Sequence, residues 1–256
     1  MKFKINRDHF SSGIQLVMSV VGTRKTMPIL HNVLIEAKDN LVWLTTTNLD
    51  LGAKCSIRAD VTEEGTITLP VKELGRIIRE LADMEVSVET ADTPKATIST
   101  RGSIFNVIGM DSKEFPPLPE LEEKKEFVFD RNELVTMLKS VSYAQSVNEE
   151  RYMLKGVFFQ LAEEKLALVA TDGRRLAVTK NKIDTKDEGE FILPSLSVNE
   201  IEKLPDVGKQ VKVSFTDRQV SFELSVEETE EKLGFQNSIY LVSKVVEGKY
   251  PNYKQV

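Results

Sequence analysis

The sequence predicts an α+β fold made of two tandem copies of one domain. The first observation is a repeat, because residues of the first half recur in the second half at a constant offset of 124 residues. The second is that each copy opens with a short alternating strand and an amphipathic helix. The third is a majority of strand-like segments in each copy, which favours sheets packed against helices. The equivalent pairs are Phe3 and Phe127, Leu30 and Leu154, Leu44 and Leu168, Thr47 and Thr171, and Pro70 and Pro194.

Beyond the pair Pro70 and Pro194, the offset between equivalent residues changes to 135 residues. Ser103 and Phe105 have their equivalents in Ser238 and Tyr240, so the second copy carries an insertion of 11 residues. A duplicated unit of this size is a whole domain. We therefore expect a first domain over residues 1–119, a linker over 120–126 and a second domain over 127–256. Arrays of equivalent domains are more typical of binding surfaces than of a buried active site.

Each copy is built from the same series of elements. A helix with apolar residues at helical spacing covers residues 10–21 and 134–141, with Asp8 and Asp130 as the expected N-caps. A hairpin follows, over 33–46 and 157–170, with turns at residues 39–40 and 163–164. A second helix begins after Pro70 and after Pro194. The remaining strands are expected at 86–89, 96–100, 104–108, 211–215, 220–224 and 239–242.

Composition indicates a globular protein of the cytoplasm. The 256 residues are 41% hydrophobic and 29% charged, which is enough to bury two ordinary cores. The start of the chain lacks the apolar region of a signal peptide, and no apolar stretch reaches the roughly 20 residues of a membrane span. The only cysteine, Cys55, is expected to be a small buried hydrophobe. The net charge is −6, but acidic residues cluster at 120–126 and 227–231, which leaves other faces free to be basic.

The motifs of catalytic and metal sites are missing from the sequence. Its two histidines, His9 and His31, align with Glu133 and Lys155 in the second copy and have no neighbouring metal ligand. There is no Cys-x-x-Cys, glycine-rich phosphate loop or Gly-x-Ser-x-Gly. We therefore expect no catalysis, no metal and no cofactor, and an enzyme is the least favoured hypothesis.

The helix after Pro70 carries a line of basic residues. Its buried face consists of Leu74, Ile77, Ile78 and Leu81, whereas Lys72, Arg76 and Arg79 lie on another face. Such a line faces either phosphates or water, and Glu73 and Glu80 favour the second interpretation. Further candidates for contact with an anionic partner are Arg24, Lys25, Arg151 and Tyr152.

The two copies differ at one loop. The first copy reads Thr-Asn-Leu-Asp-Leu from Thr47, and the second reads Thr-Asp-Gly-Arg-Arg-Leu from Thr171. Asp-Gly is typical of a tight turn, and Gly173 leaves room beside the sheet. A gap beside Leu154, Leu176 and Pro251 would suit a short apolar peptide. The alternative is a plain turn that carries surface arginines.

Four segments together resemble one protein family. They are Met-Lys-Phe at residue 1, Met-Pro-Ile-Leu at residue 27, Thr-Asp-Gly-Arg-Arg-Leu-Ala at residue 171 and Val-Glu-Gly-Lys-Tyr-Pro-Asn-Tyr at residue 246. In this order they resemble the bacterial β sliding clamp, the processivity subunit of the replicative DNA polymerase III holoenzyme. The resemblance covers the whole chain. It implies repeats of the DNA-clamp domain, each with two helices on the inner face of a ring and antiparallel sheets outside.

The resemblance also implies a function and its residues. Members of the family encircle duplex DNA as a homodimeric ring without reading its sequence, and they bind polymerase, clamp-loader and repair proteins through a short linear motif. Residues carried over to DNA contact are Arg24, Lys72, Asn148, Arg151 and Tyr152. Residues carried over to the peptide pocket are Leu154, Thr171, Gly173, Arg174, Arg175, Leu176, Pro251 and Val256. Residues carried over to the subunit interface are Ile77, Leu81, Phe105 and Val107.

Two departures from the family pattern bear on this expectation. The chain stops at Val256, where a third copy of the domain should begin, and Gln255 stands where a basic residue is expected. We therefore expect a fragment of a longer chain, monomeric or weakly associated, with a pocket that lacks part of its wall. A second hypothesis is a peptide-binding adaptor that does not encircle DNA.

Overall fold

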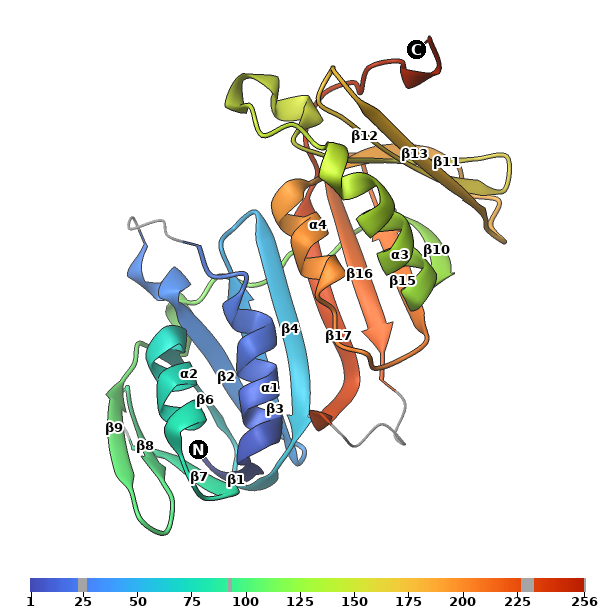
Figure 1. Cartoon of the computed structure of the whole chain (residues 1–256). Coiled ribbons are helices and arrows are strands. Elements are labelled where there is room, and N and C mark those ends of the chain that lie inside the picture. Colours follow the sequence, from blue (N-terminus) through green and yellow to red (C-terminus); the bar gives the residue numbers. More distant parts are fainter. Residues whose placement is uncertain (23–26, 92–93, 227–232, 256) are drawn as a thin grey trace. The chain divides into compact units, whose positions relative to one another are not determined.

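The structure is a computed structural model that describes residues 1–22, 27–91, 94–226 and 233–255 (Figure 1). The chain divides into two compact units. The first contains Met1–Leu118 and Ser225–Leu241, and the second contains Pro119–Leu224 and Val242–Val256. The chain therefore passes between the units more than once, because Ser225–Leu241 belongs to the first unit and the segments before and after it belong to the second.

The first unit contains two antiparallel sheets. One has the strand order β5-β1-β7-β8-β9, and the other contains β4-β3-β2-β6. The strands are β1 (Lys2–Asn6), β2 (Asn32–Lys38), β3 (Leu41–Thr47), β4 (Leu51–Arg58), β5 (Asp60–Glu63), β6 (Gly65–Pro70), β7 (Glu85–Thr90), β8 (Lys95–Ser99) and β9 (Ile104–Ile108). The helices are α1 (Arg7–Met18) and α2 (Val71–Glu80).

The core of the first unit lies between its helices and its sheets. Figure 1 shows α1 and α2 side by side, and α1 also contacts β3 and β4. The predicted helical stripe is buried, with Phe10, Ile14 and Val17 almost inaccessible to solvent. On α2, Leu74 and Ile78 are fully buried. The apolar face that the sequence pattern predicted is thus the face that packs.

The second unit repeats this arrangement. One sheet has the order β13-β12-β11-β14 and the other contains β10-β15-β16-β17, while α3 packs against α4, β12 and β13. The strands are β10 (Lys125–Asp130), β11 (Gly156–Ala162), β12 (Lys165–Thr171), β13 (Leu176–Lys182), β14 (Gly189–Pro194), β15 (Gln210–Phe215) and β16 (Gln219–Ser225), whereas β17 (Phe235–Lys244) is divided between the two units after Leu241. The helices are α3 (Arg131–Val141) and α4 (Ser195–Glu202).

The duplication seen in the sequence holds for the elements. The bounds of β11, β12 and β14 are those of β2, β3 and β6 moved by the same 124 residues. Both predicted hairpin turns have two successive residues with left-handed backbone, with φ of 53° and 57° at Asp39 and Asn40 and of 54° and 56° at Glu163 and Glu164. Such pairs match the twist of antiparallel strands. The predicted α+β tandem repeat is confirmed.

One of the two predicted helix caps is wrong. Asp130 caps α3, since its carboxylate accepts a hydrogen bond from the backbone N–H of Glu133 at 2.9 Å. Asp8 instead lies inside the first turn of α1, and the cap is Asn6, whose side chain accepts from the N–H groups of Asp8 and His9. Asn6 is also the residue 124 positions before Asp130. The repeat was therefore a better guide to the cap than residue type alone.

Two predictions from composition can be compared with the structure. Cys55 on β4 is fully buried, as expected, and burial raises the pKa of its thiol far above the ordinary value. Within the described ranges, no helix has the length and apolar character to cross a membrane.

Candidate functional site

The loop between β12 and β13 is held by the side chains of Thr171 and Asp172. The Asp172 carboxylate accepts hydrogen bonds from the backbone N–H groups of Arg174 and Arg175 at 2.9 and 3.0 Å. The Thr171 hydroxyl accepts from the N–H of Gly173 at 3.0 Å and donates to the carbonyl of Arg175 at 2.7 Å. The two backbone hydrogen bonds to its carboxylate lower the pKa of Asp172, the backbone N–H of Arg174 contributing most. The turn is therefore fixed by local bonds that favour the ionised carboxylate.

The first copy makes the same turn with different side chains. Asn48 accepts from the N–H groups of Asp50 and Leu51 at 3.0 and 2.9 Å, as Asp172 does at the equivalent place. Leu49 has a φ of 74°, and Gly173 has a φ of 84°. Left-handed backbone is unfavourable for a leucine and free for a glycine. The two copies thus share the backbone conformation of this turn, and they differ in the side chain at the left-handed position, which is Leu49 in the first copy and Gly173 in the second.

The space above Gly173 is occupied by the side chain of Arg151. A Cβ atom added to Gly173 would lie 2.5 Å from Nη1 of Arg151, and that nitrogen donates to the carbonyl of Asp172 at 3.0 Å. The Arg175 guanidinium lies 5.5 Å from the ring centre of Tyr143, and its Nε donates a hydrogen bond to the Asp172 carboxylate at 3.0 Å. The room that the glycine was predicted to leave is therefore filled by a cation.

An apolar cluster lies next to this turn. It comprises the buried residues Leu154, Phe158, Val169, Ile192 and Tyr250. The rings of Phe158 and Tyr250 are stacked with centres 4.7 Å apart, and burial raises the pKa of Tyr250 to about 12. Partly buried Met153, Leu176, Val246 and Tyr253 pack against the cluster. Phe158, Val169 and Ile192 are paired across β11, β12 and β14, so they share the sheet face opposite α3 and α4.

The structure brings several predicted pocket residues to this place. Leu154 belongs to the apolar cluster and Leu176 packs against it, while Gly173, Arg174 and Arg175 are exposed on the neighbouring turn. Pro251 is exposed next to the buried Tyr250, and Val256 lies outside the described residues. The equivalent cluster in the first copy contains Ile29, Leu30 and Phe115 with Leu34 and Met110 packed against it.

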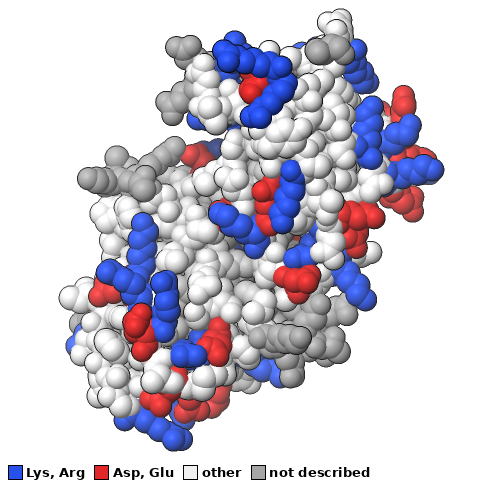
Figure 2. Space-filling model, viewed as in Figure 1, with Lys and Arg blue, Asp and Glu red and all other residues white. Residues whose placement is uncertain are grey.

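The residues predicted to contact DNA lie in two places. Lys72, Arg76 and Arg79 are exposed on α2, and Figure 2 shows basic atoms beside acidic ones over this helix. Asn148, Arg151 and Tyr152 are exposed before and within the short helix Glu149–Leu154 of the second unit. Arg24 and Lys25 lie outside the described residues.

The predicted subunit edge is only partly open to solvent. Phe105 on the edge strand β9 is 38% exposed, and its neighbours Ile104 and Ile108 are 71% and 77% exposed. Leu81 and Val107 are buried within the first unit, and Ile77 is half-buried. The apolar side chains that this edge offers are therefore those of Ile104, Phe105 and Ile108, of which sequence reasoning named only the middle one.

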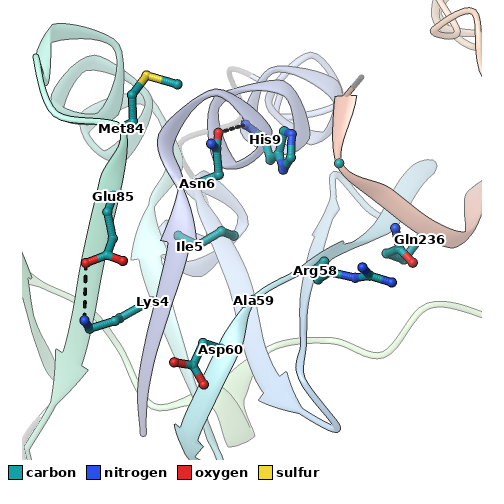
Figure 3. A pocket seen from close by; sticks show the side chains of 11 residues that line it. Lys4, Ile5, Asn6, His9, Arg58, Ala59, Asp60, Met84, Glu85 and Gln236 are labelled. Carbon is teal, nitrogen blue, oxygen red and sulfur yellow. Dashed lines mark hydrogen bonds and ion pairs between the residues drawn. The ribbon is translucent and has the colours of Figure 1, made fainter. Parts of the chain in front are cut away.

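A hollow of about 620 Å³ in the first unit was not foreseen from the sequence (Figure 3). Lys4 and Glu85 line it as an ion pair at 3.2 Å, while Arg58 and Asp60 add one charge of each sign. His9 also lines it. Within the described part of the chain, no three His, Cys, Asp or Glu side chains are grouped to hold a metal ion. The hollow is thus lined by charges of both signs in balance.

Comparison with known families identifies both copies. Residues 1–119 match the N-terminal domain of the DNA polymerase III beta subunit, and residues 129–252 match its central domain. Two such α+β units in tandem define a clamp-type repeat protein. The chain belongs to the DNA polymerase III beta subunit family, the bacterial beta sliding clamps.

Relatives and solved structures extend over the whole chain. It is 33% identical to the beta sliding clamp of Synechocystis sp. and 30% identical to that of Chlamydia trachomatis, covering 68% and 59% of these proteins. The crystal structure of the Bacillus subtilis sliding clamp superposes with a TM-score of 0.89 at 27% identity, over all of this chain and 67% of that one. A clamp from Bartonella birtlesii, solved bound to griselimycin, gives 0.89 at 30% identity, over all of this chain and 68% of that one. The chain thus spans about three fifths to two thirds of these relatives.

The turn predicts a specific titration for Asp172. Its pKa should lie below the ordinary value of about 3.9, and it should stay below that value in Arg175→Leu because the backbone donors remain. A depressed pKa means that the ionised carboxylate adds stability above the unfolded-state pKa and that this stability is lost as pH falls through the folded pKa. Carboxyl-detected NMR titration measures the pKa of Asp172 in the unaltered protein and in the variant. An ordinary pKa in the variant would show that the arginine side chain, not the turn, is responsible.

Proposed function

We propose that the protein acts as a DNA sliding clamp and as a docking platform, without chemistry of its own. The observation that supports this most is the match of both copies, over the whole chain, to the beta subunit family. The duplex would be held by exposed basic residues on helices, among them Lys72 and Arg76. Replication and repair proteins would bind at the turn around Gly173. Such a protein works in the cytoplasm, where bacterial DNA is replicated.

The exposed basic residues suit sequence-independent DNA binding better than sequence-specific recognition. Contacts to phosphates position a protein on DNA without reading bases, so they allow it to slide. At physiological salt the screening length is about 8 Å, so exposed cations on α2 act locally even though the net charge of the chain is −6. Residence on the DNA would then depend on closure of a ring and not on the strength of any contact.

Removing two cations of α2 should weaken duplex binding in a salt-dependent way. In Lys72→Ala/Arg76→Ala, the slope of log affinity against log salt should fall by roughly 0.9 for each phosphate that the protein no longer neutralises. Fluorescence anisotropy of a labelled duplex between about 50 and 200 mM salt measures the slope.

The matched control is Lys95→Ala/Arg101→Ala, which removes the same two residue types from exposed places outside the helices. An equal decrease of slope in this control would contradict the assignment to α2. Duplex binding without salt dependence in the unaltered chain would favour the second hypothesis, a peptide-binding adaptor that does not encircle DNA.

The docking site that we propose is centred on Leu176 and Leu154. Leu154 belongs to the apolar cluster and Leu176 packs against it. The adjoining turn carries Arg174 and Arg175, and the Arg151 side chain donates a hydrogen bond to the turn from another segment. Apolar side chains of a short peptide would pack beside Leu176, while the arginines would meet polar groups of its backbone or its acidic residues. Pro251 and Val256 are further proposed members of this site, together with Thr171.

A charge placed at Leu176 should strongly weaken this docking. Leu176→Asp puts a carboxylate against the apolar cluster, so affinity for a short peptide rich in leucine and phenylalanine should fall by roughly tenfold or more, about 1.4 kcal/mol. Isothermal titration calorimetry measures the affinity, and circular dichroism checks that the fold is kept. Leu196→Asp, an exposed leucine on α4, is the control. Equal affinity in the two variants would refute the site.

Ring assembly is a property that we propose for the longer proteins of the family. The exposed side chains of β9 would form one side of a subunit interface, together with Ile77 and the backbone around Leu81 and Val107. We propose domain boundaries at residues 1–119 and 127–256, with a third copy of the domain in the longer relatives.

A further inference from the structure

The outer face of the sheet β13-β12-β11-β14 changes from apolar to cationic along its strands. On the edge strand β13, alternate residues share a face, and this face reads Leu176, Val178, Lys180, Lys182. Val178 is paired with Val169 of the apolar cluster, so this is the face opposite the helices. The six steps from Leu176 to Lys182 along an extended strand span about 20 Å. One strand therefore connects the proposed docking site with a basic surface.

The cationic end of this face is concave. A hollow of about 400 Å³ lies there, and we call it the cationic hollow. Ala162 and Ala167 give it a shallow floor, while Lys165, Lys180 and Lys182 stand around them on β12 and β13. Small side chains between long ones leave space that a ligand can enter. The hollow thus results from small and long side chains that lie next to each other on one face of the sheet.

The positive charge of the cationic hollow is largely uncompensated. Lys165 and Lys182 lie directly opposite each other in the β12–β13 pairing, an arrangement of like charges that destabilises a sheet. Among the described residues, Lys180, Lys182 and Lys254 form no ion pair, and Glu163 approaches Lys165 only to 4.0 Å. An anionic ligand would therefore relieve repulsion as well as add attraction.

The cationic hollow is continuous with the apolar cluster through Tyr253. The Tyr253 ring packs edge-on to Phe158 with centres 6.3 Å apart, and the same side chain lines the hollow. Its hydroxyl donates to the Gln160 side chain at 2.9 Å, and Gln160 also lines the hollow. Glu190, paired with Gln160 across the strands, is the acidic group on the border between the two regions. A chain lying on the cluster would therefore reach the lysines without crossing the edge of the sheet.

We propose that the cationic hollow binds an acidic segment that flanks the apolar docking peptide of a partner protein. This inference rests on the proposed docking function. It adds that a partner peptide is recognised by two of its features. Its apolar side chains pack beside Leu176, and several carboxylates a few residues away in the same peptide bind the cationic hollow. An extended peptide fits the observed path, because its rise per residue is that of the strand beneath it. Attraction of this kind also accelerates the encounter of the two proteins.

The test compares peptides that have the same apolar residues and different flanks. One carries a run of glutamates after the apolar residues, one carries it before them, and a third carries glutamines. One of the two acidic peptides should bind roughly 3- to 30-fold more tightly than the neutral one at low salt, the range expected for a few exposed ion pairs. The gain should shrink as salt rises. Anisotropy of the labelled peptides gives the affinities.

The variant Lys180→Gln/Lys182→Gln should remove this gain and leave the neutral peptide bound as before. Lys139→Gln/Lys209→Gln, two exposed lysines that do not line the cationic hollow, should keep it. Three outcomes would overturn this inference and leave the docking function standing. The acidic peptides could show no gain in affinity, the gain could survive in Lys180→Gln/Lys182→Gln, or it could be lost equally in Lys139→Gln/Lys209→Gln. Failure of the neutral peptide to bind overturns the docking function and this inference together. Loss of duplex affinity in the first variant, with peptide affinities unchanged, would assign the hollow to nucleic acid and also overturn it.

Discussion

The register of the β12–β13 hairpin is the constraint on which the candidate site depends. Side chains alternate between the two faces of a strand, so a slip of one residue would move every side chain of β13 to the other face. The register is fixed at the turn, where Asp172 and Thr171 hold four backbone groups. Leu176 therefore faces the apolar cluster, and Lys180 and Lys182 face outward with it.

Duplication shows how a structural turn became a candidate site. The first copy makes the same turn with Asn48 and Leu49, and there the side-chain amide of Asn48 also donates to the carbonyl of Val20, two residues after the end of α1. In the second copy glycine relieves the left-handed position and admits the guanidinium of Arg151. The backbone hydrogen bonds were kept, while the side chains above them changed. A function could thus be added to one domain without a new fold.

Much of the fold could be predicted from the sequence, because the pattern that predicts each element occurs in both copies. The site was predicted less completely. Gly173 and Leu176 carry local signals, but the place of Arg151 depends on a loop 21 residues away from Asp172 in sequence, and nothing local reveals it. The cationic hollow was missed for the same reason: Lys180 and Lys182 are ordinary strand residues until pairing sets Lys165 opposite Lys182. Proximity that is set by register between strands cannot be read from composition or periodicity.

The central claim is that the second copy, and not the first, binds apolar peptides on the outer face of its sheet. Methyl NMR during titration with a leucine-rich peptide tests this most directly. Leu30 of the first copy is the equivalent of Leu154, and Leu34 packs against the equivalent cluster, so both serve as an internal control. The account predicts chemical-shift changes at Leu154, Leu176 and Val178 and none at Leu30 and Leu34. Changes of equal size at Leu30 and Leu34, or changes confined to other parts of the protein, would contradict it.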